Sequence, residues 1–374
     1  MFQTSTSAYR LARPWWSWAR VTPFVIVIGA GQAGLAAGYY LKRARFPFRI
    51  IDVSDRVGDS WRERYASLTL FTPRAFSALP PIPLEGNRDG YATRDEFAEY
   101  LEAYAAQLEL PVTCGARAAR LSLAAKAGFE AMLDTGDTIN ASHVIIATGG
   151  FQTSVIHPAT KDFAQGVVQL RAETYRKTCL PSSCQWLVVG DGATGRDVAV
   201  ELAANFRSVL LATGKPRKLF PEHILGKSTW WWLRRSGLMQ VSSRSLLGHA
   251  MQRADPFPDR DRNLESLRQR GIRVVPRLVG GSGKIATFAD GTKAEISGIA
   301  WAIGHRDDSA WVDIPAAKDP DGAFLQHQGV SPVPGLFFVG RPWQRNRASA
   351  LIMGAGDDAE AIVRRISKDP AITR

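Results

Sequence analysis

The sequence predicts an α/β fold with two parallel-sheet domains, and two glycine-rich loops that follow buried strands are the main evidence. The first loop, Gly29–Gly34, follows the apolar run Phe24–Ile28. The second loop, Gly190–Gly195, follows the apolar run Trp186–Val189. Continuous runs of this kind are typical of strands that are buried on both faces. Both loops have the pattern G-x-G-x-x-G, and a helix-compatible segment follows each of them.

The first loop belongs to a complete Rossmann-like dinucleotide-binding unit. Its helical segment, Leu35–Arg43, leads to a second apolar strand, Phe48–Ile51, which ends in Asp52. The glycines permit a tight turn, close approach of a pyrophosphate and packing of the helix on the strand. The helix N-terminus attracts phosphates, and Asp52 can accept hydrogen bonds from ribose hydroxyls. The candidate contacts in this unit are Gly29, Gly31, Gln32, Ala33, Gly34 and Asp52.

The second unit lacks an acid at the end of its second strand, Val209–Leu211. Lys215 and Arg217 follow this strand, and positive charge there suits a 2′-phosphate, which favours NADP over NAD. The alternative is that both are ordinary loop cations. Asp191 inside the loop is unfavourable beside a pyrophosphate unless its carboxylate points away. The candidate contacts here are Gly190, Gly192, Ala193, Thr194, Gly195, Lys215 and Arg217.

The remaining elements are predicted from local signals. Thr93 and Glu96 form a capping box that opens a helix. The strand Val144–Ile146 precedes the small-residue turn Ala147-Thr148-Gly149. Two more strands are predicted within 299–304 and 335–340. A last helix is predicted from about Gly356 to Arg365, with Asp357 and Asp358 in its first turn and two arginines in its last.

These elements predict the domain organisation. We expect a first dinucleotide-binding domain in 21–155 and 296–374, interrupted by a second in 156–295. Residues 1–20 carry three tryptophans, three arginines and no acid, and lack the apolar run of a secretory signal. We interpret them as a disordered extension or a start codon assigned too early. An interfacial membrane anchor is the alternative.

Composition excludes several classes of function. The chain has 374 residues and a formal charge of +12, but no dense Lys/Arg tract, so no nucleic-acid partner is expected. No apolar run reaches the ~20 residues of a membrane span. Three cysteines without a CxxC pair indicate a reducing, cytoplasmic location and argue against a dithiol–disulfide reductase. Cysteine and histidine spacings predict no metal site.

Further motifs carry a family resemblance. A G-x-x-W element, with Gly58, Ser60 and Trp61, follows the first acidic strand end, and Ala147-Thr148-Gly149 forms an ATG turn. With these, the chain resembles the FAD-dependent, NADPH-using flavin-containing (class B) monooxygenases over roughly 22–367. The stretches 65–73 and 344–357 resemble a branch known as potassium-transport flavoproteins or as monooxygenases of arsenic-resistance operons.

The resemblance implies FAD at the first loop and NADPH at the second. It implies a monooxygenase that forms a C4a-(hydro)peroxyflavin with O2 and oxygenates a small soft nucleophile or a ketone. It further implies that Gly340 and Gly354 contact FAD, and that Thr72 and Gln344 lie on the substrate side of the flavin. It is compatible with a homodimer. The alternatives are an NAD(P)H:flavin oxidoreductase or oxidase without oxygen transfer, and a nucleotide-sensing regulatory flavoprotein without enzymatic activity.

The sequence departs from the family at identifiable positions. Phe163, Gly166 and Tyr175 match the fingerprint F-x-G-x-x-x-H-x-x-x-Y with one extra residue, but Arg171 stands at the histidine position. Arg171 is either a substitute contact to NADP or an exposed loop arginine. The second ATG turn reads Ala302-Ile303-Gly304. The run Trp230–Trp232 would spread around a helix, which favours core and interface packing over lining a substrate cavity.

Overall fold

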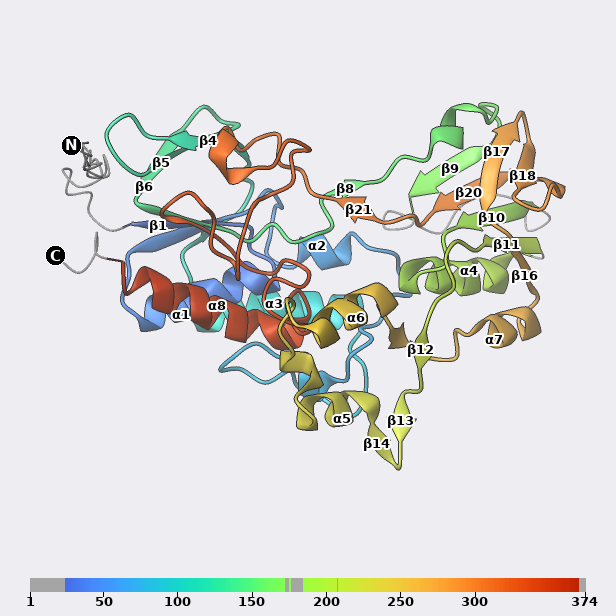
Figure 1. The fold of residues 1–374 in the computed structure, drawn as a ribbon, viewed down its shortest axis with the longest axis horizontal. Coiled ribbons are helices and arrows are strands. Elements are labelled where there is room, and N and C mark those ends of the chain that lie inside the picture. The colour runs from blue at the N-terminus through green and yellow to red at the C-terminus, as the bar shows by residue number, and fades with distance from the viewer. Residues whose placement is uncertain (1–23, 172–174, 176–183, 207, 370–374) are drawn as a thin grey trace, which may run out of the picture.

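The computed structural model describes residues 24–171, 175, 184–206 and 208–369. It has two lobes, each built around a five-stranded sheet in which all paired strands are parallel (Figure 1). The predicted α/β class with two Rossmann-like units is therefore confirmed. The predicted extension, 1–20, lies outside the described residues.

The first sheet has the order β22-β7-β1-β2-β3. Its strands are β1 (Val25–Ile28), β2 (Phe48–Ile51), β3 (Val112–Thr113), β7 (His143–Ile146) and β22 (Leu336–Phe338). Alternate side chains of β1 enter different cores: Val27 joins the cluster with the helices, and Ile26 joins the cluster on the opposite face. The sheet is thus covered on both sides, which explains its continuous apolar strands.

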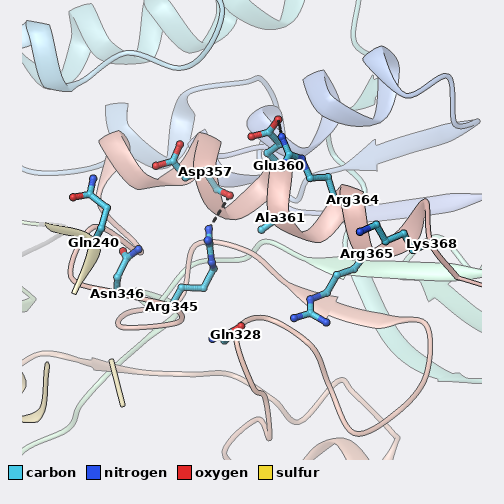
Figure 2. Close-up of a pocket in the computed structure, with 10 residues that line it drawn as sticks. All are labelled: Gln240, Gln328, Arg345, Asn346, Asp357, Glu360, Ala361, Arg364, Arg365 and Lys368. Atoms are coloured by element: carbon cyan, nitrogen blue, oxygen red, sulfur yellow. Dashed lines mark hydrogen bonds and ion pairs between the residues drawn. The ribbon is translucent and has the colours of Figure 1, made fainter. Parts of the chain in front are cut away.

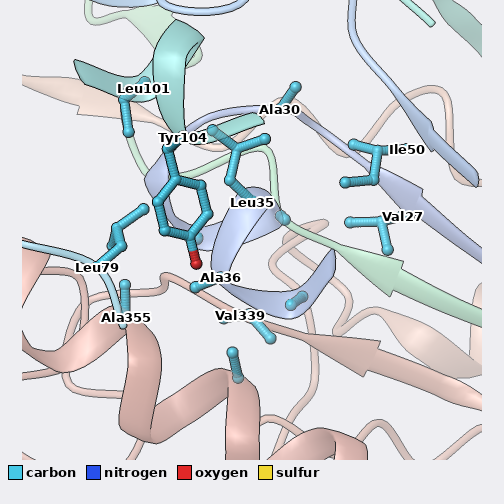
Figure 3. Close-up of a cluster of buried hydrophobic side chains, with 14 of the residues drawn as sticks. Val27, Ala30, Leu35, Ala36, Ile50, Leu79, Leu101, Tyr104, Val339 and Ala355 are labelled. Atoms are coloured by element: carbon cyan, nitrogen blue, oxygen red, sulfur yellow. The ribbon is translucent and has the colours of Figure 1, made fainter. Parts of the chain in front are cut away.

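Helices cover one face of this sheet, and a small antiparallel sheet covers the other (Figure 1). The helices are α1 (Gln32–Arg43), α3 (Arg94–Gln107) and α8 (Ile352–Ile366), and the small sheet consists of β4 (Ala118–Leu123), β5 (Phe129–Leu133) and β6 (Thr138–Ala141). Figure 3 shows the helix-side core, in which Leu35 of α1, Tyr104 of α3 and Ala355 of α8 lie together. This packing fixes where α1 begins relative to the strands.

The second sheet repeats the plan with the order β16-β11-β10-β20-β9. Its strands are β9 (Val168–Arg171), β10 (Gln185–Val189), β11 (Ser208–Ala212), β16 (Ile272–Val275) and β20 (Gly298–Trp301). The helices α4 (Ala193–Asn205) and α7 (Leu264–Gln269) pack on one face. The antiparallel strands β17 (Leu278–Ser282), β18 (Ile285–Phe288) and β19 (Lys293–Glu295) pack on the other.

Two antiparallel strands join the lobes: β8 (Thr153–Ser154) and β21 (His305–Arg306) (Figure 1). The return to the first domain after Gly335 stays a prediction, which the pairing of β22 with β7 supports. The predicted boundary at 295/296 falls before β20, although β20 pairs with β10 and β9 in the second sheet. We therefore propose the β8–β21 crossing as the boundary between the domains.

A long segment between β11 and β16 leaves the second lobe and packs against the first. It contains β12 (Leu219–Phe220), β13 (His223–Ile224), β14 (Lys227–Ser228), α5 (Thr229–Arg235), α6 (Leu246–Ala254) and β15 (Phe257–Pro258). The indole of Trp230 donates a hydrogen bond of 3.0 Å to the carbonyl of Phe71. Met239 accepts one of 3.1 Å from the amide of Ala348. The segment therefore bridges the two domains.

Short elements complete the chain: α2 (Asp59–Arg62) and the 3₁₀ turns η2 (Arg74–Phe76), η3 (Pro158–Lys161), η4 (Leu238–Gln240) and η5 (Pro315–Ala317). Within the described residues, no helix combines the length and the apolar character needed to cross a membrane. The predicted capping box is confirmed, because Thr93 accepts from the amide of Glu96 and Glu96 accepts from the amide of Thr93.

The predicted start of the last helix is wrong. Helix α8 begins at Ile352, so Asp357 and Asp358 lie beyond its first turn, whereas both arginines do lie in its last turn. Gly354 and Gly356 lie inside the helix, where they allow close packing. A Cβ at Gly354 would lie 2.2 Å from the carbonyl oxygen of Ala348, and one at Gly356 would lie 2.8 Å from the ring of Pro80.

Candidate functional site

The first glycine loop is shaped by two close backbone approaches. Gly29 has φ of +109°, and a Cβ there would lie 2.6 Å from the carbonyl oxygen of Ala147. A Cβ at Gly34 would lie 1.8 Å from the carbonyl oxygen of Gly29. By contrast, a Cβ at Gly31 would meet no atom within 4 Å. The fold itself therefore requires the outer glycines, whereas the middle glycine leaves open space above the loop.

The second loop repeats this geometry. Gly190 has φ of +104°, and a Cβ there would lie 2.4 Å from the carbonyl oxygen of Ala302. A Cβ at Gly195 would lie 1.9 Å from the carbonyl oxygen of Gly190, and one at Gly192 would meet nothing within 4 Å. Ala302 thus occupies the place that Ala147 has at the first loop. The substitution of isoleucine at position 303 leaves this backbone contact in place.

Helix N-termini divide into two groups. Helices α3, α5, α6 and α7 are capped by the side chains of Thr93, Ser228, Ser245 and Asn263. Helices α1, α2, α4 and α8 have no side-chain cap. These four begin at or beside the segments predicted to bind cofactors: Gly29–Gly34, Gly58–Trp61, Gly190–Gly195 and Gly354. The first-turn amides of α1 and α4 are therefore open to an anion, whereas in α2 the amides of Asp59 and Trp61 donate to the carbonyls of Arg56 and Gly58.

Parallel pairing brings the predicted residues of the first site to one sheet edge. Strands β22, β7 and β1 are neighbours, and they end just before Gly340, Ala147 and Gly29 respectively. Gly340 has φ of +85°, and a Cβ there would lie 2.6 Å from the Cβ of Ala33. This edge, at the carboxyl ends of parallel strands, is where open α/β sheets bind ligands.

Asp52 ties the end of β2 to the glycine loop. Its Oδ2 accepts a hydrogen bond of 2.5 Å from the amide of Ala30, and its Oδ1 accepts one of 2.8 Å from the amide of Ser54. The carboxylate is half-buried at the predicted ribose end. Asp52 therefore orders the loop as well as presenting acceptor oxygens there.

The G-x-x-W element packs against the same loop. The indole of Trp61 donates to Oε1 of Gln32 at 3.2 Å, and its ring meets Phe97 edge-on with centroids 4.9 Å apart. Gly58 has φ of +92°, and a Cβ there would lie 2.6 Å from the carbonyl oxygen of Ala98. Ser60 lies within α2, one residue before Trp61. The motif is explained in part by this packing on α3.

The ATG turn is held by Gln152, which the sequence analysis missed. The amide nitrogen of Gln152 donates to Oγ1 of Thr148 and, at 2.9 Å, to the carbonyl of Gly149. Its Oε1 accepts a hydrogen bond of 2.7 Å from the amide of Asp308, which lies on the returning segment between the domains. No local motif marks Gln152, because its distant partner, Asp308, is brought close only by the β8–β21 crossing.

Thr72 and Gln344, the two residues predicted beside the flavin, are both buried but differ in their hydrogen bonding. Oγ1 of Thr72 lies 2.6 Å from Oγ of Ser77, which also contacts the carbonyls of Thr72 and Pro73. Gln344 is 2% exposed, and its Nε2 has no hydrogen-bond partner among the described residues. Nε2 of Gln344 is therefore a buried donor without a partner, next to Gly329, whereas the Thr72 hydroxyl is engaged locally.

Asp191 is paired with a buried arginine that the sequence analysis did not anticipate. Its Oδ2 lies 3.3 Å from the guanidinium of Arg196, a side chain that is 2% exposed. Its Oδ1 accepts 3.3 Å from the amide of Gly214 and lies 3.7 Å from Nε of Arg217. The carboxylate thus connects the glycine loop to the segment that carries the predicted 2′-phosphate cations, Lys215 and Arg217.

The other second-site residues follow from the sheet. Ala193 and Thr194 begin α4, immediately after the open Gly192. Arg171 ends β9 and is in register with Trp301 of β20, directly before Ala302. Arg171 is exposed at this edge of the sheet, which fits both a contact to NADP and an exposed arginine. Lys215 and Arg217 follow β11, and both are exposed.

Residues 65–69 lie between the domains. The hydroxyl of Tyr65 donates 3.0 Å to Asp197 of α4, which is also paired with Arg262 at 3.0 Å. Arg260 donates to the hydroxyl and carbonyl of Thr69. The stretch that resembles the family branch is therefore part of the domain interface.

A polar pocket of about 650 Å³ lies on the outward side of α8 (Figure 2). Arg345 donates 2.9 Å to the carbonyl of Asp357 and pairs with the buried Asp358 at 3.3 Å. Burial raises the pKa of Asp358 to about 6, against the opposing effects of Ser349 and Arg345. The residues that line the pocket include none of the predicted cofactor contacts.

The two cysteines that the structure describes, Cys114 and Cys184, are free. Cys114 follows β3 of the first sheet, and Cys184 precedes β10 of the second. Burial, together with the charges of Asp52 and Asp59, raises the pKa of the Cys114 thiol. In the part of the chain that the structure covers, no group of three or more His, Cys, Asp or Glu side chains could hold a metal ion.

Comparisons place the chain among known oxidoreductases. Over 91% of its length it is 40% identical to an uncharacterised CzcO-like oxidoreductase of Geobacillus kaustophilus, covering 97% of that protein. It is 25% identical to the indole-3-pyruvate monooxygenase YUCCA1 of Oryza sativa subsp. japonica, over 85% of this chain and 86% of that protein.

Solved structures share the fold. A flavin-containing monooxygenase from Stenotrophomonas maltophilia matches with a TM-score of 0.76 at 24% identity, over 92% of this chain and 98% of that one. OTEMO, solved in complex with FAD and NADP, matches with a TM-score of 0.67 at 15% identity, over 92% of this chain and 83% of that one. The family pattern described as pyridine nucleotide-disulphide oxidoreductase matches residues 26–222. The chain belongs to this family of oxidoreductases.

Proposed function

We propose that this chain is an NADPH-dependent flavin monooxygenase that binds FAD at the first glycine loop and NADPH at the second. One observation carries the proposal: the same loop is built twice, each time with an open middle glycine before an uncapped helix. Open amides at a helix N-terminus bind pyrophosphate. The likeness to a monooxygenase and to a fold solved with FAD and NADP supports the assignment of the two nucleotides.

The first site fits FAD by shape and by donors. Space above Gly31 admits the pyrophosphate next to the α1 amides, and Asp52 presents acceptor oxygens at the ribose end. The start of α8 has no side-chain cap, and Nε2 of Gln344 has no partner among the described residues, so both are candidate donors to FAD. Bound FAD would accept hydride and react with O2, chemistry that no side chain supplies.

The second site fits NADPH. Gly192 leaves the pyrophosphate position open before α4, and Lys215 and Arg217 stand where NAD-specific sites carry an acid. Asp191 does not repel the phosphates at full strength, because Arg196 and Arg217 offset its charge. Arg171, at the end of β9 on the same sheet edge, is a further candidate contact.

The bridging segment suits oxygen transfer because that reaction has to exclude bulk water. Trp230 is 2% exposed, donates to the carbonyl of Phe71, and packs between Phe71 and Phe220 with ring centroids 6.0 and 5.6 Å away. Phe71 directly precedes Thr72, on the predicted substrate side. We infer that this segment shields the reacting part of the flavin. The acceptor would be a small soft nucleophile or a ketone.

A thiol–disulfide reaction, which the family name would also allow, is less well supported. Thiol exchange needs a thiolate, and burial beside two carboxylates disfavours the thiolate of Cys114. Cys114 and Cys184 also belong to different sheets. These observations favour oxygen transfer over disulfide reduction at the described cysteines.

Flavin spectroscopy and product stoichiometry test the proposal. The purified chain should carry FAD, and NADPH should bleach it anaerobically at a rate compatible with turnover. After O2 is admitted with organic sulfides, amines, arsenite or ketones, at least one acceptor should lower H2O2 release per NADPH consumed. One H2O2 per NADPH with every acceptor would instead indicate an oxidase. If NADPH does not bleach the bound flavin, the result would fit the regulatory alternative.

A further inference from the structure

The turn of the hairpin β13–β14 carries a leucine that neither suits the turn conformation nor packs into a core. Leu225 and Gly226 form its two-residue turn, and both have positive φ, +49° and +72°. Turns of this kind favour Asn, Asp or Gly, because a larger side chain is strained there. Leu225 is nevertheless 87% exposed, at the tip of a hairpin that projects away from both sheets (Figure 1).

More apolar surface surrounds the tip. Ile224, Trp231 and Trp232 are all exposed. The indole of Trp232 donates 2.9 Å to the carbonyl of Ile224, and the rings of Trp231 and Trp232 meet edge-on with centroids 4.8 Å apart. The hairpin and α5 are therefore held together as one surface, which we call the hairpin patch: Ile224, Leu225, Lys227, Trp231, Trp232, Arg234 and Arg235.

The hairpin patch is strongly basic. Residues 223–235 contain Lys227, Arg234 and Arg235 and no Asp or Glu. The longer stretch 221–254 contains five Lys or Arg residues and one acid, Glu222. A cavity of about 680 Å³ beside α5 adds Arg88 and the ring of Phe76, with Asp89 as the single carboxylate on its lining. The whole chain has a net charge of +12.

We propose that the hairpin patch docks on the surface of an anionic lipid membrane. Leucine and tryptophan at the tip suit the boundary between headgroups and acyl chains, and flanking Lys and Arg suit anionic headgroups. A second copy of the chain is a poorer occupant, because it would bring the same cations face to face. No membrane-spanning helix is involved, and the proposal is independent of which molecule the enzyme oxygenates.

Vesicle flotation with the full chain tests the proposal. Wild type should float with vesicles of phosphatidylglycerol and phosphatidylcholine, should not float with phosphatidylcholine alone, and should be released by high salt. Leu225→Asn should weaken partitioning about tenfold or more. The hairpin should be kept or stabilised, because Asn suits the turn. Arg234→Gln with Arg235→Gln should weaken partitioning about 30-fold.

The matched control is Arg364→Gln with Arg365→Gln, another arginine pair in the last turn of a helix, here α8. It should leave flotation near the wild-type value. The proposal is overturned if wild type does not float, if it floats equally with neutral vesicles, or if the α8 pair matters as much as the α5 pair. It is also overturned if the hairpin variants float like wild type, which would assign binding to another part of the chain. Light scattering tests whether a second copy of the chain occupies the patch instead. If wild type is a dimer and Leu225→Asn dissociates it, the patch would be assigned to self-association.

Discussion

Replacing Gly31 with alanine separates folding from FAD binding. Gly31 has φ of −72° and ψ of −176°, which alanine adopts freely, and its added Cβ meets no protein atom within 4 Å. Losing glycine at this N-cap costs about 0.5–1 kcal/mol, and the stiffer unfolded chain returns about 0.4–1 kcal/mol. We therefore expect the stability of the apoprotein to change by less than about 1 kcal/mol.

The same methyl group occupies the space through which the pyrophosphate approaches the loop. Overfilling a close-packed site costs about 1–3 kcal/mol. This corresponds to a FAD dissociation constant that is about 5- to 150-fold higher. Gly192→Ala is the matched variant at the second loop, where the added Cβ also meets nothing within 4 Å. This variant should leave FAD binding unchanged and weaken NADPH binding by a similar factor.

Gly34→Ala supplies the contrast. Its Cβ would lie 1.8 Å from the carbonyl oxygen of Gly29, so backbone must move, and we expect a loss of stability of more than about 3 kcal/mol. The assay removes FAD, follows thermal unfolding of each apoprotein, and titrates FAD by fluorescence quenching; NADPH binding is taken from the concentration dependence of flavin reduction. A Gly31→Ala protein that binds FAD like wild type would refute the reasoning, and so would one that fails to fold.

Three further predictions concern charges. Lys215→Ala with Arg217→Ala should weaken the binding of NADPH at least tenfold more than that of NADH in flavin-reduction assays, because each cation contributes about 1 kcal/mol or more to binding a 2′-phosphate. Equal effects on the two nucleotides would contradict the assignment. Asp191→Asn should loosen the Gly214–Arg217 segment and weaken NADPH several-fold more than NADH, whereas tighter NADPH binding would show that the carboxylate mainly repels phosphate. The raised pKa of Asp358, about 6 against an ordinary 3.8, means that its ionisation destabilises the folded chain progressively from about pH 4 to about pH 6. The free energy of unfolding of Asp358→Asn, relative to that of wild type, should therefore rise by about 2–3 kcal/mol between pH 4 and pH 7, measured by thermal melts across that range. A difference in stability that does not change with pH would rule out this titration.

The sequence predicts what is decided by nearby residues. Each glycine loop lies next to its own strand and helix, so the pattern reports contacts such as Gly34 against Gly29, within one short segment. The capping box at Thr93 is equally local. These features are confirmed because little else in the fold competes with them.

Features that depend on distant contacts were missed or misplaced. Helix α8 begins before the predicted start, and Gly356 lies inside it packed on Pro80, a contact that only the fold reveals. Gln152 carries no motif, although it joins the ATG turn to Asp308, 156 residues away. The membership of β20 in the second sheet is likewise set by pairing with strands on both sides.

At both sites a carboxylate links the glycine loop to the end of the neighbouring strand, but the acid belongs to the strand end at one site and to the loop at the other. This difference bears on cofactor choice. In both, the first loop glycine donates its amide to the last residue of the neighbouring strand, Ile51 or Ala212. At the first site the acid stands after the strand, and Asp52 reaches back to the amide of Ala30. At the second site the acid stands in the loop, and Asp191 reaches out to the amide of Gly214.

Because either direction fastens the loop to the strand end, loop order alone does not require an acid at the ribose position. Placing the carboxylate in the loop frees that position for cations, and it holds one of them, Arg217, within 3.7 Å. An acid after the strand would repel a 2′-phosphate, whereas cations there attract it. We therefore propose that Asp191, which from sequence alone conflicts with nucleotide binding, lets the second site keep an ordered loop and still offer positive charge to a 2′-phosphate.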